Sequence, residues 1–151
     1  MDLKELNKTL RADARAKGLC DEWYGEWKEE NDSLQQLIDK YIKGFDFCAE
    51  NRYPSNEFIK ENFPQELLRK NNILVDDTYS LLNPKYAVIL GSSKTTIRCN
   101  GYTVSTVYVF DSADVTLSAK SHAHVIVHVY GPDTRLSVID ESSNKVLVRK
   151  H

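Results

Sequence analysis

The feature that most constrains the fold is a series of short apolar stretches with β character, which recur from residue 107 onward. The recurring groups are Val107/Val109, Val115/Leu117, Val125/Val127/Val129, Leu136/Val138 and Val146/Val148. Their first members are 8, 10, 11 and 10 residues apart, and turn-forming residues lie between them. Spacing of this kind is typical of short strands that stack and bury one another's apolar faces.

Two architectures fit this spacing. In a β-roll or short β-solenoid, successive strands enter two sheets in alternation, so each coil takes about twenty residues and parallel neighbours gain a return path. In an antiparallel β-sandwich, each turn is a hairpin, and Asn100-Gly101 is a strong hairpin signal. The later turns vary in length and lack such dipeptides. We therefore expect a β-solenoid, with the antiparallel β-sandwich as the alternative.

The first half of the chain has helical periodicity. Leu3, Leu6 and Leu10 form one stripe, and Gly18 is a suitable C-terminal residue for that helix. Further helices are predicted over residues 21–30, 34–49, 56–63 and 64–70, with N-capping side chains at 31–33. Gly44 lies inside the helix predicted over residues 34–49, where it permits close packing or a bend.

Together these patterns predict an α+β protein. We expect a helical subdomain over residues 1–75, followed by a repetitive β subdomain over residues 76–151. The net charge of −2 hides a division, because residues 1–80 carry 12 basic and 17 acidic side chains and residues 81–151 carry 8 and 5. The two parts therefore differ in sign, at −5 and +3.

Composition indicates a soluble cytoplasmic protein with no membrane partner. Hydrophobic residues make up 41% of the chain, no apolar run approaches membrane-spanning length, and the first residues lack the apolar core of a secretory signal. The three cysteines are an odd number and include no C-x-x-C motif. This pattern favours reduced thiols over a disulfide framework.

The outward side of the predicted strands is unusually apolar for a solenoid surface. If the recurring valines face inward, the outward set contains aromatic and aliphatic side chains that need a cover. The helices of the same chain, a second copy or a foreign protein are the three candidates for that cover. The candidate partner-binding residues are Tyr108, Phe110, Ile126, His128 and Tyr130.

One histidine cluster raises the alternative of a metal-binding protein or metalloenzyme. On a strand, His122 and His124 would point to one side about 7 Å apart, which suits one metal ion. His128 would lie about 13 Å further along, and no carboxylate is interleaved as a third ligand. We therefore predict no metal site, no cofactor and no catalytic residue.

The basic residues of the β half raise a second alternative, the binding of nucleic acid or nucleotides. They are Lys94, Arg98, Lys120, Arg135, Lys145 and Arg149. Aromatic residues nearby in sequence would help to bind single strands. A charge of +3 is modest for such a role, and the segment 91–94 lacks the spacing of a phosphate-binding loop. Nucleic acid is therefore not the favoured partner.

Four segments carry a resemblance to known proteins: LIDKYIKGFDFC, YPSNEFIKENF, NPKYAVILGSS and VYVFDSADVTLSAKSHAHVIVHVY. They resemble uncharacterised small proteins of gut Bacteroidota and their phages or mobile elements. The resemblance implies a helical N-terminal part and a short solenoid-like C-terminal part, and it transfers no catalytic residue. A phage origin would suit an inhibitor of host defence of the anti-CRISPR type. We expect a non-enzymatic protein-interaction module that binds a protein partner or itself.

Overall fold

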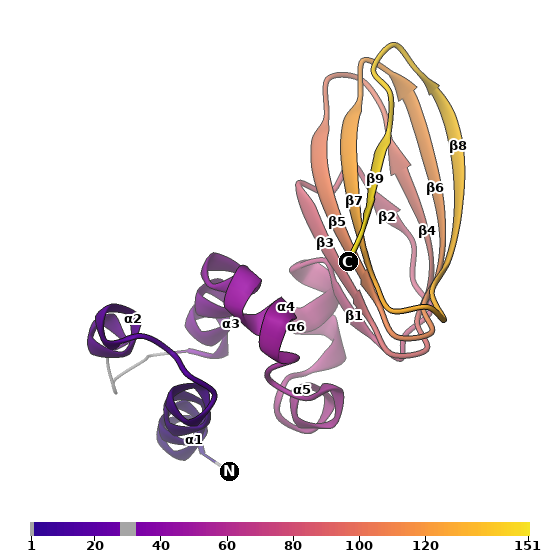
Figure 1. The fold of residues 1–151 in the computed structure, drawn as a ribbon. Coiled ribbons are helices and arrows are strands. Elements are labelled where there is room, and N and C mark those ends of the chain that lie inside the picture. The colour runs from indigo at the N-terminus through magenta and orange to yellow at the C-terminus, as the bar shows by residue number, and fades with distance from the viewer. Residues whose placement is uncertain (1, 28–32) are drawn as a thin grey trace. The chain divides into compact units, whose positions relative to one another are not determined.

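The computed structural model describes residues 2–27 and 33–151. The chain forms two compact units, Met1–Pro64 (unit 1) and Gln65–His151 (unit 2). Figure 1 shows helices in the first and a stack of strands after one helix in the second. The expected α+β class, with helices first and strands afterwards, is confirmed.

Unit 1 is helical. Its helices are α1 (Leu3–Ala16), α2 (Asp21–Glu26), α3 (Leu34–Lys43), α4 (Phe45–Asn51) and α5 (Asn56–Asn62). Three of them begin at a side-chain cap: Asp2, Ser33 and Ser55 each accept a hydrogen bond from a backbone N–H three residues later. The predicted stripe of α1 faces inward, because Leu6 and Leu10 are buried. Tyr53 joins this core and donates its hydroxyl hydrogen bond to the carbonyl oxygen of Leu10.

Two predicted helices differ from the structure. The helix expected over 21–30 ends at Glu26, and residues 28–30 lie outside the described part, as do the predicted caps Asn31 and Asp32. The helix expected over 34–49 is divided at Gly44, which ends α3 and precedes α4. The physical reason is local, since glycine has the weakest helix propensity apart from proline.

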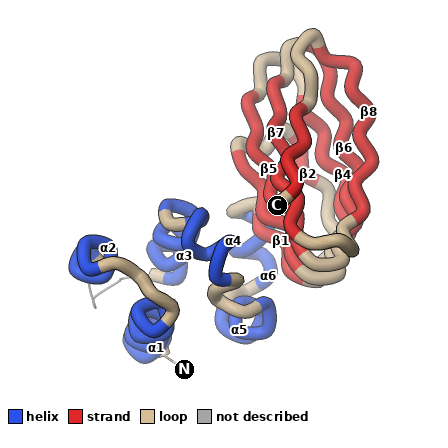
Figure 2. The backbone as a smooth tube through the Cα atoms, viewed as in Figure 1, coloured by secondary structure: helices blue, strands red, loops and turns tan. Residues whose placement is uncertain are grey.

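Unit 2 is a parallel β-solenoid that follows α6 (Gln65–Lys70), a helix packed against β1. The strands are β1 (Ile73–Val75), β2 (Leu81–Leu82), β3 (Tyr86–Leu90), β4 (Lys94–Cys99), β5 (Val104–Phe110), β6 (Asp114–Ser121), β7 (His124–Tyr130), β8 (Arg135–Ser142) and β9 (Leu147–Lys150). Sheet A has the order β1-β3-β5-β7-β9, and sheet B has the order β2-β4-β6-β8. Figure 2 shows the strands of both sheets joined by short loops.

All neighbouring strands in both sheets are parallel, so the solenoid is confirmed and the antiparallel sandwich is wrong. The Asn100-Gly101 turn does not form a hairpin. It carries the chain from sheet B to sheet A, where β5 pairs with β3 and β7 instead of with β4. A turn dipeptide reverses the chain in either architecture, so it does not distinguish them.

The register of the solenoid is regular after a shorter first coil, in which Ile73 pairs with Val88 and Leu81 with Ile97, offsets of 15 and 16 residues. Val104 pairs with His124 and Lys94 pairs with Asp114, an offset of twenty residues in both sheets. The last coil has an offset of 21, because Asp114 pairs with Arg135 and Ile126 with Leu147. Equivalent side chains of successive coils therefore lie in columns.

The core of unit 2 consists of inward-facing aliphatic columns. Its fully buried members include Ile89, Ile97, Val107, Val109, Val115, Leu117, Val125 and Val127. Two residues expected inside, Val138 and Val148, are instead 39% and 43% exposed. They do lie in the inward columns, since they pair with Leu117 and Val127, but they belong to the edge strands β8 and β9.

One corner of the solenoid is built from residues in the left-handed conformation. Asp76, Gly91, Asp111 and Gly131 have φ values of 48°, 69°, 58° and 100°. Asp76 Oδ1 accepts hydrogen bonds from the Ser92 N–H (2.8 Å) and the Ser92 hydroxyl (3.1 Å), and the Gly91 N–H donates to Asp111 Oδ2 (2.8 Å). A Cβ atom on Gly91 would lie 2.0 Å from Asp76 Oδ1, so this position requires glycine.

A buried ion pair stands at the beginning of the solenoid. The Arg69 guanidinium of α6 donates two hydrogen bonds to Asp77, at 2.8 Å and 2.7 Å. The Asp77 side chain is 5% exposed. Its hydrogen bonds from Arg69 hold the pKa of the carboxyl below its ordinary value, although burial acts in the opposite direction. The pair therefore fixes α6 to the loop that follows β1.

Candidate functional site

The outer face of sheet A brings the predicted partner-binding residues together. The register places Tyr108 directly beside His128, and Phe110 directly beside Tyr130. Ile126 lies in the adjacent column between Thr106 and Leu147. Because the offset between β5 and β7 is constant, residues twenty positions apart in sequence become neighbours on this face.

Side-chain rings on this face stack into what we call the ring ladder: Tyr108, Phe110, His128, Tyr130 and His151. The centroids of Tyr108 and His128 are 5.1 Å apart with an interplanar angle of 13°, and those of Phe110 and Tyr130 are 4.5 Å apart at 6°. His151 stacks on Tyr130 at 4.4 Å, and its Nε2 lies 2.8 Å from His128 Nδ1. Each such ring pair contributes about 0.5–1.5 kcal/mol beyond its buried area.

His151 was not among the residues predicted from the sequence. It follows Lys150, which pairs with Val129, so it continues the column of Tyr130. The offset from Tyr130 to His151 is 21 residues, the same as between β7 and β9. This offset could have identified His151 from the sequence, but it can be recognised only after the register of the strands is known.

Burial varies across the outer face of sheet A. Val88 and Leu90 on β3 are 0% and 3% exposed, whereas Tyr108, His128 and Tyr130 are half-buried. Phe110, another predicted partner-binding residue, is only 1% exposed. It faces outward from the sheet, but its ring is covered and it acts by holding Tyr130 in place. Half-buried Ile126 and the four rings other than Phe110 remain the candidate contact surface.

His122 and His124 do not form the pair that alternation along a strand predicts. Ser121 has φ 58°, a left-handed conformation that ends β6, so His122 lies in the turn. Its ring stacks on Tyr102 at 4.7 Å, and its Nδ1 lies 2.9 Å from the Ser143 hydroxyl. His124 is exposed at the start of β7. Within residues 2–27 and 33–151, no three His, Cys, Asp or Glu side chains are grouped as metal ligands.

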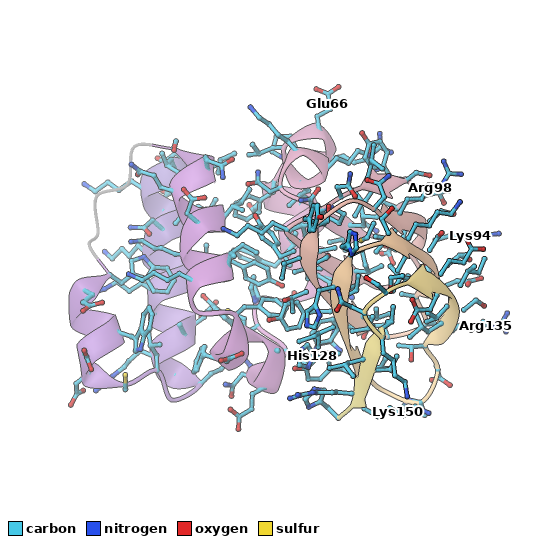
Figure 3. The ribbon with its side chains drawn as sticks, turned by 90° about the horizontal axis from the view of Figure 1, so that it is seen from above. Glu66, Lys94, Arg98, His128, Arg135 and Lys150 are labelled. Atoms are coloured by element: carbon cyan, nitrogen blue, oxygen red, sulfur yellow. The ribbon has the colours of Figure 1, made fainter. Side chains whose placement is uncertain are left out.

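The outer face of sheet B is mostly polar and charged, with Leu82 and Ile139 as exposed apolar side chains in the column of Arg98. Its columns follow the register: Lys94–Asp114–Arg135, Thr96–Thr116–Ser137, Arg98–Ser118–Ile139 and Lys120–Glu141. Four of the six basic residues singled out from the sequence thus share one face. Lys145 lies instead in the turn before β9, and Arg149 lies on sheet A. Lys94, Arg98 and Arg135 project from the same side of the solenoid (Figure 3).

The three cysteines are free thiols with different surroundings. Cys20 is exposed, whereas Cys48 and Cys99 are buried. Burial raises the pKa of Cys48 to about 12 and also raises the pKa of Cys99. Both buried residues are therefore thiols at neutral pH and lack the thiolate that nucleophilic chemistry uses.

No helix in the described part of the chain has the length and apolar character needed to cross a membrane. Comparisons with known protein families, with curated proteins and with solved structures find no match.

Proposed function

We propose that this chain is a non-enzymatic protein-interaction module that binds a protein partner through the outer face of sheet A. The observation that carries the proposal is the ring ladder, in which Tyr108, His128 and Tyr130 are held by stacked ring pairs at centroid distances of 4.4–5.1 Å. Aromatic side chains with a polar tip are enriched at protein interfaces. Rings that are already ordered lose little conformational entropy when a partner binds.

The scaffold beneath the ladder supports the same role. The ladder strands β5 and β7 are central in sheet A, and their inward residues Val107 and Val127 are fully buried. The rings on β5 and β7 therefore stand on a rigid base and keep their positions when a partner approaches. The helices of the same chain and a second copy are the other covers predicted for this apolar face, and the test must distinguish a foreign partner from self-association.

The test uses two matched substitutions on opposite faces. Ile126→Glu places a carboxylate in the candidate surface, whereas Ile139→Glu makes the same change on the outer face of sheet B. A lysate of the source organism is passed over each immobilised protein. We expect wild type and the Ile139→Glu variant to retain the same protein, and the Ile126→Glu variant to lose it.

Two further measurements assign the interface. In the purified complex, hydrogen exchange of the β5 and β7 amides should slow relative to the free chain. Light scattering of the chain alone distinguishes self-association, which would appear as a dimer that Ile126→Glu disrupts. Equal retention by the two variants, or slowed exchange confined to sheet B, would refute the proposed surface.

The finer expectations from the sequence remain predictions. They are an origin in gut Bacteroidota or their phages, a cytoplasmic location and a role as an inhibitor of host defence. The last of these predicts that the retained partner is a component of a defence system. Identification of that partner by mass spectrometry would test it directly.

A further inference from the structure

The outward positions of β4, β6 and β8 carry four cations and two carboxylates, Asp114 and Glu141, so this face of sheet B has an excess of positive charge. Lys94, Arg98, Lys120 and Arg135 are exposed, and within the described residues their side-chain nitrogen atoms make no hydrogen bond and no ion pair closer than 4.0 Å. Lys94 and Arg98 lie four residues apart on β4, about 13 Å, and Arg135 lies two strands from Lys94, about 10 Å. The parallel strands hold these positions on one flat face.

Hydroxyl groups lie between the cations. Thr96, Thr116 and Ser137 form one column, with Ser118 beside it. Hydroxyl and guanidinium groups are common donors to phosphate oxygens, and guanidinium pairs with phosphate in a bidentate manner. This face therefore offers donors and positive charge together.

Aromatic residues are absent from the outward positions of β4, β6 and β8, all of which the structure describes. A face without aromatic side chains cannot stack unpaired bases, which is how proteins hold single strands. It suits the regular backbone of a duplex, where binding depends on phosphate contacts and does not read the sequence.

We infer that the outer face of sheet B binds the sugar-phosphate backbone of double-stranded DNA, through Lys94, Arg98, Lys120 and Arg135 with the hydroxyl column between them. This activity is independent of the protein-binding role proposed for sheet A. Two carboxylates share the face, and Asp114 lies between Lys94 and Arg135 in its column. Asp114 therefore weakens the attraction and limits the affinity.

Four phosphate contacts give a definite salt dependence. The slope of log K against log salt is expected to be about −3.6, which is 0.9 for each of four contacts. Affinity should therefore fall by roughly two orders of magnitude between 50 and 200 mM salt. A face that binds by hydrogen bonds or apolar contact alone would show a much smaller slope.

The experiment measures fluorescence anisotropy of a labelled 20-base-pair duplex titrated with the full chain at 50, 100 and 200 mM salt. The variant Lys94→Gln/Arg98→Gln/Arg135→Gln should bind at least tenfold more weakly, with a slope near −0.9 from the remaining Lys120. Circular dichroism checks that this variant keeps its β-sheet signal.

A matched control removes three exposed cations from unit 1, namely Lys4 and Lys8 on α1 and Lys17 at the C-terminal cap of that helix. Changing these three to glutamine alters the net charge equally and should leave the affinity within about twofold of wild type. Asp114→Asn should tighten binding about twofold, a gain that a folding defect cannot produce.

Several results would overturn the inference. They are no binding to the duplex at 50 mM salt, equal losses in the triple variant and its control, or tighter binding to the single strand of the same sequence. Binding of a heparin oligosaccharide without binding of the duplex would also overturn it, since the face would then recognise an acidic polysaccharide.

Discussion

Replacing Gly91 with alanine is expected to destabilise unit 2 by about 3 kcal/mol, from two separate costs. The first is conformational, because Gly91 has φ +69° and a left-handed L-residue costs about 1–2 kcal/mol. The second is steric, because the new Cβ would lie 2.0 Å from Asp76 Oδ1. Asp76 must turn away and give up its two hydrogen bonds from Ser92, each contributing about 1 kcal/mol.

Gly101 provides the matched control. Its φ is +61°, but an added Cβ would meet no atom within 4 Å, so Gly101→Ala should show the conformational cost alone, about 1 kcal/mol. An Asp76→Ala background removes the contact with the carboxylate and leaves the backbone nitrogen of residue 76 at 3.3 Å, so the cost of Gly91→Ala should fall to about 1 kcal/mol. Comparing Gly91→Ala, Gly101→Ala and Gly91→Ala in the Asp76→Ala background separates the conformational cost of a left-handed alanine from the steric cost of the contact with Asp76.

The assay is urea unfolding followed by far-ultraviolet circular dichroism, to which both the strands of unit 2 and the helices contribute. Both tryptophans, Trp23 and Trp27, lie in unit 1, so their fluorescence follows the helices separately. The reasoning would be refuted if Gly91→Ala and Gly101→Ala were equally destabilising. It would also be refuted if the cost of Gly91→Ala were unchanged when Asp76 is alanine.

Three further predictions concern the core, the ion pair and the thiols. Leu117→Ala, at a fully buried position, should cost about 3 kcal/mol in the same urea assay, and a loss below about 1 kcal/mol would contradict the packed core. Because Arg69 lowers the pKa of Asp77 in the folded state, the ion pair should stabilise the chain at pH values above the unfolded pKa of about 3.9, and this stability should be lost as the pH falls through the lower folded value. Asp77→Asn should therefore be less stable than wild type by about 1–2 kcal/mol at pH 7, and the difference should shrink below pH 4; a constant difference would argue against the pair. In the native protein, Cys20 should react with a thiol reagent in seconds to minutes and Cys48 only after unfolding, so fast modification of more than one thiol would contradict the burial.

The architecture of unit 2 was predictable because periodicity reports directly on strand stacking. Apolar groups about ten residues apart require two strands for each twenty-residue coil, and the observed offset from Val104 to His124 is twenty. The same periodicity cannot show whether a strand is central or at an edge. Val138 and Val148 keep the inward alternation and are nevertheless exposed, because their strands are the edges of the two sheets.

The candidate surface was predicted in part. Tyr108, His128 and Tyr130 meet as expected, since alternation fixes which side of a strand a residue faces. Phe110 has the same alternation and is buried, because coverage depends on tertiary packing that a single sequence does not encode locally. His122 lies in a turn, because the left-handed conformation of Ser121 ends the strand before it. Serine has no strong preference for that conformation, so the sequence did not predict this strand end.

The offset of twenty residues shared by the β3–β5, β4–β6 and β5–β7 pairs makes the middle of this solenoid divisible into equivalent layers. A duplicate of residues 104–123 inserted after itself would add one complete turn, lengthen both lateral faces by about 4.8 Å and leave every existing layer in its frame. Deleting one residue from a strand would instead exchange interior and exterior for the rest of that strand. The length of the two outer faces can therefore change in steps of one coil, by evolution or by design.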